Sequence, residues 1–212
     1  LDSMLKAVQT AEIEEYKPKE NWYVLMAACY SELESRIGKD ESLYKQLDIY
    51  EILVNLYPKK MYFIQLGGIY SQLSREIDYM VTLNAAYQKD LLDKQTEYLT
   101  LASLLLQNNN PYWAAKVLEA GRKKRVPVID EKTKEEKILP VVKDNEKNLK
   151  LLADAWRMAQ EMDLAIPIME KAAKLAKDGQ TYIILGSLYL SEDKLEEAVS
   201  AIEEGLKKGK VK

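Results

Sequence analysis

The chain has 212 residues, 47% of them hydrophobic, and its 31 basic and 34 acidic residues leave a formal net charge of −3. This is enough apolar sequence for a continuous core, and the charge balance lacks the basic excess that nucleic-acid binding needs. With 8 glycines and 6 prolines, few residues interrupt helices, so the composition favours an all-helical fold.

Histidine is absent and Cys29 is the single cysteine. The chain therefore has no histidine to serve as a catalytic base or metal ligand, and no internal disulfide. We expect Cys29 to be a buried hydrophobic residue on a helix. The carboxylates near Asp130 and Asp144 lack the spacing of a calcium loop, so we expect no metal or other cofactor. No stretch has the ~18 apolar residues of a membrane span, so we expect no membrane insertion.

The first expected helix covers residues 2 to 16. It looks like the second helix of a pair whose first helix would precede Leu1, so the chain resembles a piece of a longer protein. An end helix without its neighbour would leave an apolar face uncovered. We therefore predict a homodimer through this N-terminal helix.

Five later segments share one pattern. Each has a bulky residue, a Leu three positions later, in most cases a small residue directly after the Leu, and a bulky residue four beyond the Leu. These offsets fall on one face of a helix. The segments are Trp22–Cys29, Phe63–Tyr70, Tyr98–Leu105, Leu149–Trp156 and Tyr182–Tyr189.

A second helix follows each segment, with small residues such as Ala198 and Gly205 where two helices would meet closely. Gln46 and Tyr79 stand where other pairs have a small residue. The expected helix pairs are 21–35 with 41–56, 60–73 with 75–89, 94–107 with 111–124, 146–160 with 163–177, and 180–191 with 195–208.

Equivalent positions recur at Met26, Gly67, Ala102, Ala153 and Gly186, at intervals of 41, 35, 51 and 33 residues. Two of these intervals are close to the tetratricopeptide period of about 34. The longer intervals indicate insertions.

The first insertion, around residues 35–42, lengthens a turn within a pair. The second lies between Arg125 and Asn145, where two apolar segments flank a charged one, which indicates either a loop or a short hairpin. The basic run from Arg122 to Arg125 just before it is interpreted as a solvated helix end, with a polyanion site as the alternative.

This repeat resembles the tetratricopeptide repeat (TPR) along essentially the whole chain. The resemblance implies an all-α solenoid, a right-handed superhelix of antiparallel helix pairs, in a single domain over 1–212. Its parts would be an orphan helix at 1–17, pairs at 18–58, 59–93, 94–127, 145–178 and 179–212, and an insertion at 128–144.

A closer resemblance is carried by Glu20–Tyr23, Leu56–Leu66, Ala115–Gly121 and Asn145–Trp156. These segments are similar to bacterial TPR proteins found beside the TonB, ExbB and ExbD energy-transduction components. The resemblance implies a periplasmic protein that binds a protein or peptide of an envelope system. The alternative is a cytoplasmic TPR adaptor or a binder of co-chaperone type, although Asp154 stands where a chaperone-tail clamp needs Asn.

In stacked helix pairs, the first helices line the concave side, and their concave residues are not needed for the core. We therefore predict a partner-binding groove; the alternative is a surface that packs against another part of the full chain or another copy. Aromatic residues and Arg are common anchors of protein interfaces. The TPR resemblance implies which positions face the groove, and the predicted site residues at these positions are Tyr23, Tyr30, Ile64, Gln72, Leu99, Ser103, Lys150 and Arg157.

No set of residues in the sequence has the composition of a catalytic site. Glu203 and Glu204, for example, are expected on the solvated face of a helix. The predicted function is a non-catalytic protein-interaction scaffold, and an enzyme of unfamiliar type is the alternative from another class.

Overall fold

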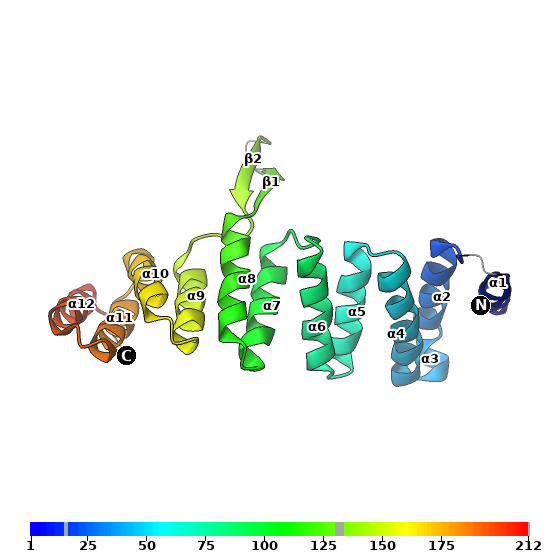
Figure 1. Ribbon diagram of the computed structural model, residues 1–212, viewed down its shortest axis with the longest axis horizontal. Helices are drawn as coiled ribbons and strands as arrows, with labels where there is room; N and C mark the ends of the chain where they lie inside the picture. The colour runs from blue at the N-terminus through cyan, green and yellow to red at the C-terminus, as the bar shows by residue number, and fades with distance from the viewer. Residues whose placement is uncertain (15–16, 130–133, 212) are drawn as a thin grey trace. The chain divides into compact units, whose positions relative to one another are not determined.

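The computed structural model describes residues 1–14, 17–129 and 134–211. They form two compact units, unit 1 at residues 1–92 and unit 2 at 93–212 (Figure 1). In unit 1 the helices are α1 (Asp2–Ile13), α2 (Glu20–Glu32), α3 (Glu34–Ile37), α4 (Lys39–Leu56), α5 (Lys60–Gln72) and α6 (Glu76–Gln88). In unit 2 the elements are α7 (Gln95–Gln107), α8 (Pro111–Lys123), β1 (Arg125–Ile129), β2 (Glu136–Pro140), α9 (Glu146–Met158), α10 (Met162–Leu175), α11 (Gln180–Ser191) and α12 (Leu195–Lys208).

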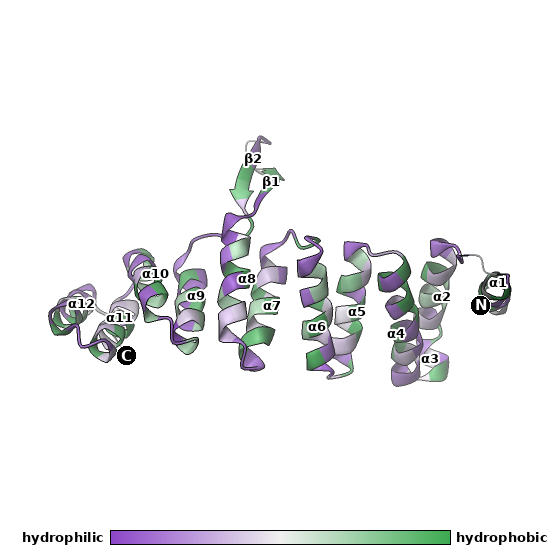
Figure 2. Cartoon of the chain, in the orientation of Figure 1, coloured by the Kyte–Doolittle hydropathy of each residue, from purple (hydrophilic) through white to green (hydrophobic). Residues whose placement is uncertain are grey.

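Within each unit, every helix packs against the next long helix of the chain. The pairs are α2 with α4 and α5 with α6 in unit 1, and α7 with α8, α9 with α10, and α11 with α12 in unit 2. Apolar and polar residues alternate around most helices (Figure 2). This alternation gives each helix one face for its neighbours and another for water.

The repeat pattern correctly identifies the core of the later pairs. The Leu residues at its centre, Leu66, Leu101, Leu152 and Leu185, are all buried. The small residues that follow them, such as Gly186, are buried as well. The first and second helices of that pair are so close that a Cβ added to Gly186 would lie 2.7 Å from Ile202 Cγ1. The glycine therefore permits this close approach.

In α2 the predicted register is wrong by one residue. Leu25, the expected core residue, is 41% exposed, whereas Met26 and Tyr23 are buried. The pattern that the structure uses is Tyr23, Met26, Ala27 and Tyr30, which has the same spacing shifted by one position. The shift also explains why Cys29, expected to be buried, is only half-buried.

A hydrogen bond between neighbouring pairs supports the corrected register. Glu20, three residues before Tyr23, accepts a hydrogen bond from the hydroxyl of Tyr62 on α5. Lys59 Nζ lies 2.6 Å from the same carboxylate. These contacts connect the start of α2 to the start of α5.

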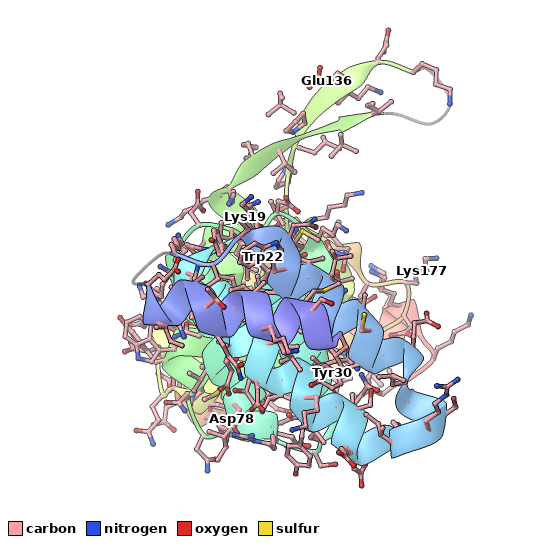
Figure 3. All side chains as sticks on the ribbon, turned by 90° about the vertical axis from the view of Figure 1, so that its right-hand side faces the viewer. Lys19, Trp22, Tyr30, Asp78, Glu136 and Lys177 are labelled. Atoms are coloured by element: carbon pink, nitrogen blue, oxygen red, sulfur yellow. The ribbon has the colours of Figure 1, made fainter. Side chains whose placement is uncertain are left out.

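The apolar side of α1 faces α2. Leu1, Met4, Leu5 and Val8 pack against the cluster that contains Tyr23. Of the side chains described on α1, the exposed ones are polar except for Ile13. Figure 3 shows α1 in front, with Trp22 and Tyr30 on α2 behind it. The prediction that α1 has an uncovered apolar face is therefore wrong, because α2 already covers that face.

The first insertion contains a short helix that the sequence did not predict. The expected helix 21–35 ends at Glu32, and α3 follows at Glu34–Ile37. Gly38, with a φ of +91°, then turns the chain into α4, a backbone conformation that favours glycine. Ser42 Oγ donates to the carbonyl oxygen of Tyr30 at 2.8 Å, which holds the start of α4 against α2.

The second insertion forms the hairpin rather than the loop. β1 and β2 pair antiparallel, with Arg125 opposite Pro140 and Ile129 opposite Glu136. The hairpin extends beyond the end of α8 (Figure 1), and Glu136 lies on its outer part (Figure 3). Residues 130–133, within the predicted insertion, lie outside the described residues.

The basic run from Arg122 to Arg125 spans the end of α8 and the first residue of β1. Arg122 makes two hydrogen bonds to the carboxylate of Asp144, at 2.6 and 2.8 Å. Arg125 Nη1 donates to the carbonyl oxygens of Arg122 and Lys123. Both arginines thus contribute to the helix end and to the base of the hairpin.

None of the helices described has the length and apolar content needed to cross a bilayer.

Candidate functional site

The predicted site residues of unit 1 lie in different environments. Tyr23 is 2% exposed and belongs to the core cluster, so the prediction that it faces a partner is wrong. Tyr30 is half-buried against the same cluster. Ile64, at 37% exposure, and Gln72 are exposed on α5, as predicted groove residues should be.

Three predicted residues of unit 2 lie together. Leu99 and Ser103 on α7 and Lys150 on α9 line one cavity of about 590 Å³. Arg157 is exposed about two turns beyond Lys150 on α9, and its Nε lies 3.3 Å from Oδ1 of Asp154, which lines the cavity.

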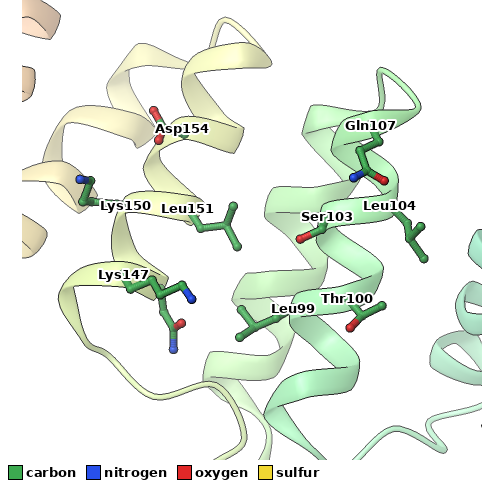
Figure 4. A pocket seen from close by; sticks show the side chains of 10 residues that line it. Leu99, Thr100, Ser103, Leu104, Gln107, Lys147, Lys150, Leu151 and Asp154 are labelled. Atoms are coloured by element: carbon green, nitrogen blue, oxygen red, sulfur yellow. The ribbon is translucent and has the colours of Figure 1, made fainter.

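We call this cavity the α7/α9 groove. One wall consists of α7 residues and the other of α9 residues, so two first helices of successive pairs form it (Figure 4). Its lining residues are Leu99, Thr100, Ser103, Leu104 and Gln107 on α7, and Lys147, Asn148, Lys150, Leu151 and Asp154 on α9.

A polar network fixes the start of α9 beside α7. Asn145 Oδ1 accepts from the backbone N–H of Asn148, which caps the helix. The buried Asn148 side chain donates to Gln95 Oε1 at 3.1 Å and to the carbonyl oxygen of Lys143 at 2.8 Å. Because Gln95 begins α7 and Asn148 lies in the first turn of α9, this network sets the position of the two walls.

Polar side chains on α7 remain available to a ligand. In the described part of the chain, the side chains of Thr100, Ser103 and Gln107 have no hydrogen-bond partner. All three residues line the groove, and Ser103 points toward α9 (Figure 4). Hydroxyl and amide groups placed this way can bind the N–H and C=O groups of an extended chain.

The charged residues of the groove follow one another along α9. Lys147 lies near Leu99 at the end where α7 and α9 begin, Lys150 lies about one turn further along, and Asp154 lies toward Gln107 at the other end (Figure 4). Among the described residues, neither lysine has a carboxylate within ion-pair distance. Asp154 is compensated by Arg157.

Several residues that line the groove were not predicted from the sequence, among them Thr100, Leu104, Lys147 and Leu151. A helical-spacing rule would have found two of them, because Lys147 precedes Lys150 by three residues and Leu151 precedes Asp154 by three. Leu104 was not found because it is mostly buried while still lining the groove. Residues with both roles are not distinguishable from core residues by periodicity.

No protein-family model matches this chain. No curated protein matches it either.

Solved structures with a similar fold do exist. YrrB, a TPR protein with an unusual peptide-binding site, has a TM-score of 0.55 and 13% identity over 94% of this chain and 91% of that chain. A crystal structure of MamA has a TM-score of 0.51 and 17% identity, covering 80% of this chain and 90% of that chain. MamA from Desulfovibrio magneticus RS-1 has a TM-score of 0.51 and 16% identity, with 86% and 94% covered. These similarities establish the fold, which is an all-α solenoid of the tetratricopeptide type.

Proposed function

We propose that this protein is a non-catalytic scaffold that holds an extended segment of a partner protein in the α7/α9 groove. The observation that supports it most directly is the groove itself. It lies between two successive first helices, and it combines apolar walls with polar side chains that have no hydrogen-bond or ion-pair partner among the described residues. The peptide-binding site of YrrB supports the same use of this fold.

The chemistry of the groove favours binding over catalysis. Its ionisable side chains are Lys147, Lys150 and Asp154. Asp154 is paired with Arg157 and partly exposed, so it lacks the desolvated environment of a general acid or base. An unfamiliar enzyme is therefore the weaker alternative.

The finer part of the proposal concerns the cellular context. We infer a periplasmic protein that binds a component of a TonB-type envelope system, from the similarity of Glu20–Tyr23 and Asn145–Trp156 to bacterial TPR proteins found beside TonB, ExbB and ExbD. The alternative context is a cytoplasmic adaptor. The homodimer predicted through α1 is not part of the proposal, because the apolar side of α1 packs within unit 1.

The test is site-specific photo-crosslinking in cells of the source organism. A benzophenone amino acid replaces Ser103 in the groove or, as the control, Lys174, which is exposed on α10. We expect a discrete crosslinked product from the Ser103 position alone, recovered in the periplasmic fraction with an envelope protein. The same products from both positions would refute the groove, and a cytosolic product would refute the envelope context.

A further inference from the structure

We propose that the α7/α9 groove selects an acidic, extended segment, with its carboxylates beside Lys147 and Lys150 and an aliphatic side chain against Leu99 and Leu151. This inference rests on the proposed function, because it specifies the chemistry of the segment that the groove binds.

The groove carries positive charge on α9. Lys147 and Lys150 lie about one turn apart on this helix, and both line the groove. Neither has an acidic partner among the described residues. The adjacent Glu146 does not line the groove, and its Oε1 accepts a hydrogen bond from Thr181 on α11. The positive end of the α9 helix dipole adds to the attraction for an anion at this end.

The one acidic residue of the groove lining already has a cationic partner. Asp154 lies toward the end near Gln107, and Arg157 compensates its charge. The lining therefore keeps a net positive charge from Lys147 and Lys150. A segment that carries carboxylates complements this charge, whereas a basic segment would meet two uncompensated lysines.

Apolar surface adjoins the charges of the groove. Leu99 and Leu104 on α7 and Leu151 on α9 border the groove. Burying an aliphatic side chain there removes apolar area from water on both sides, which stabilises the complex. An exposed ion pair alone contributes little to the free energy of binding. The contact of an aliphatic side chain with the leucines is therefore the second feature by which the groove selects its segment.

The dimensions fit an extended segment. The eight-residue step from Leu99 to Gln107 spans about 12 Å at ~1.5 Å per helical residue. That length corresponds to about four residues of extended chain at ~3.3 Å each. Over this length Thr100, Ser103 and Gln107 can bond the backbone, while the lysines and leucines contact its side chains.

The experiment is an NMR titration of the whole 15N-labelled chain, which detects weak binding. The probes are six-residue peptides, acetylated and amidated at their ends, that alternate Leu with Glu, Gln or Lys. We expect the Glu–Leu peptide to shift amide signals of α7 and α9 and to bind about tenfold more tightly than the Lys–Leu peptide, with an affinity that falls as salt is added.

Charge-reversal variants test whether the two lysines cause the preference for the Glu–Leu peptide. Lys150→Glu and Lys147→Glu should each weaken binding of the Glu–Leu peptide several-fold while the remaining spectrum stays folded. Lys174→Glu, the same charge change on exposed α10, should leave it nearly unchanged apart from the small effect of net charge.

Binding of the Gln–Leu or the Lys–Leu peptide in the groove as tightly as the Glu–Leu peptide would overturn the acidic selectivity and leave the proposed function standing. Binding only by a Glu–Leu peptide with a free C-terminal carboxylate would overturn it in favour of terminal recognition. If no peptide shifts signals of α7 and α9, both the inference and the groove are refuted.

Discussion

Thr181 Oγ1 donates a hydrogen bond to Oε1 of Glu146 at 2.7 Å, and so connects the start of α11 to the start of α9. The same relation occurs at two other places: Asn148 donates to Gln95, and Tyr62 donates to Glu20. In each case the acceptor stands three residues before the first bulky residue of its repeat, and the donor directly precedes that residue in the next repeat. The bond therefore repeats with the helix pairs, although its chemical groups change.

The hydrogen bond between Thr181 and Glu146 predicts a specific loss of stability. Thr181 is fully buried, so Thr181→Val keeps its shape and removes only the hydroxyl. We expect the free energy of unfolding to fall by about 1–2 kcal/mol in urea titrations. Ser187→Ala, on the same helix, removes an exposed hydroxyl whose bond is local to the carbonyl of Ile183, and should change stability by less than ~0.5 kcal/mol. Equal losses in the two variants would contradict the link between pairs.

Two adjacent glycines on α5 should respond in opposite ways. A Cβ on Gly67 would lie 2.8 Å from the ring of Tyr79, so Gly67→Ala should destabilise the chain by roughly 1–3 kcal/mol. A Cβ on Gly68 would have no heavy atom within 4 Å, and Gly68→Ala should stabilise by about 0.5–1 kcal/mol through helix propensity. Thermal denaturation checks both. Similar shifts of the midpoint in the same direction would show that Tyr79 does not approach Gly67 closely.

The corrected register of α2 predicts which of two neighbouring side chains carries the stability. Tyr23→Ala removes a buried ring and should cost roughly 3–5 kcal/mol. Leu25→Ala removes a side chain that is 41% exposed and should cost less than about 1 kcal/mol. Chemical denaturation of both variants decides between the registers, because the register first expected predicts the reverse order.

Alkaline pH should weaken the contacts between helix pairs. Burial, together with the hydrogen bond to Glu170, raises the pKa of Tyr189 to about 12, and burial with the bond to Glu20 raises the pKa of Tyr62 to about 12. A raised pKa means that the contribution to stability is complete below the ordinary value of ~10 and is lost as pH rises from about 10 to 12. Denaturation at a series of pH values, with phenolate absorbance recorded in parallel, measures this loss.

The matched variants for this prediction are Tyr189→Phe and Tyr44→Phe. Tyr189→Phe should reduce the loss of stability above pH 10, because its ring cannot ionise. Tyr44 is exposed on α4, so Tyr44→Phe should retain the wild-type dependence. Identical profiles for all three proteins would show that Tyr189 does not couple folding to pH.

Helical periodicity predicted the later pairs because their apolar residues allow one alignment. Leu152, for example, is followed by a small residue and preceded by Leu149, and no neighbouring frame has the same sequence of types. In α2 two frames fit, since Trp22 and Tyr23 are both bulky and Leu25 and Met26 are both aliphatic. Contacts with α1 and α5 distinguish them, and these depend on residues distant in sequence.

The candidate site was predictable only in part for a related reason. Leu99, Ser103 and Lys150 were found because they occupy the solvent-facing positions of first helices. A cavity, however, is made by two helices at a particular separation, and here that separation depends on the bonds of Asn148 to Gln95 and to the carbonyl of Lys143. Such a network has no periodic signature in a sequence.

The hairpin between α8 and α9 has a consequence for where this chain can accept change. Hydrogen bonds join the two ends of the hairpin at its base: Val142 N donates to the carbonyl of Gly121, Val141 N donates to the carbonyl of Lys124, and Arg122 donates to Asp144. Because these bonds hold the ends together, the part of the hairpin beyond them can vary in length without altering the spacing of α8 and α9. Evolution can therefore replace the hairpin with a different appendage at this position, and an engineer can attach a reporter domain there, while the helix pairs on either side keep their contacts.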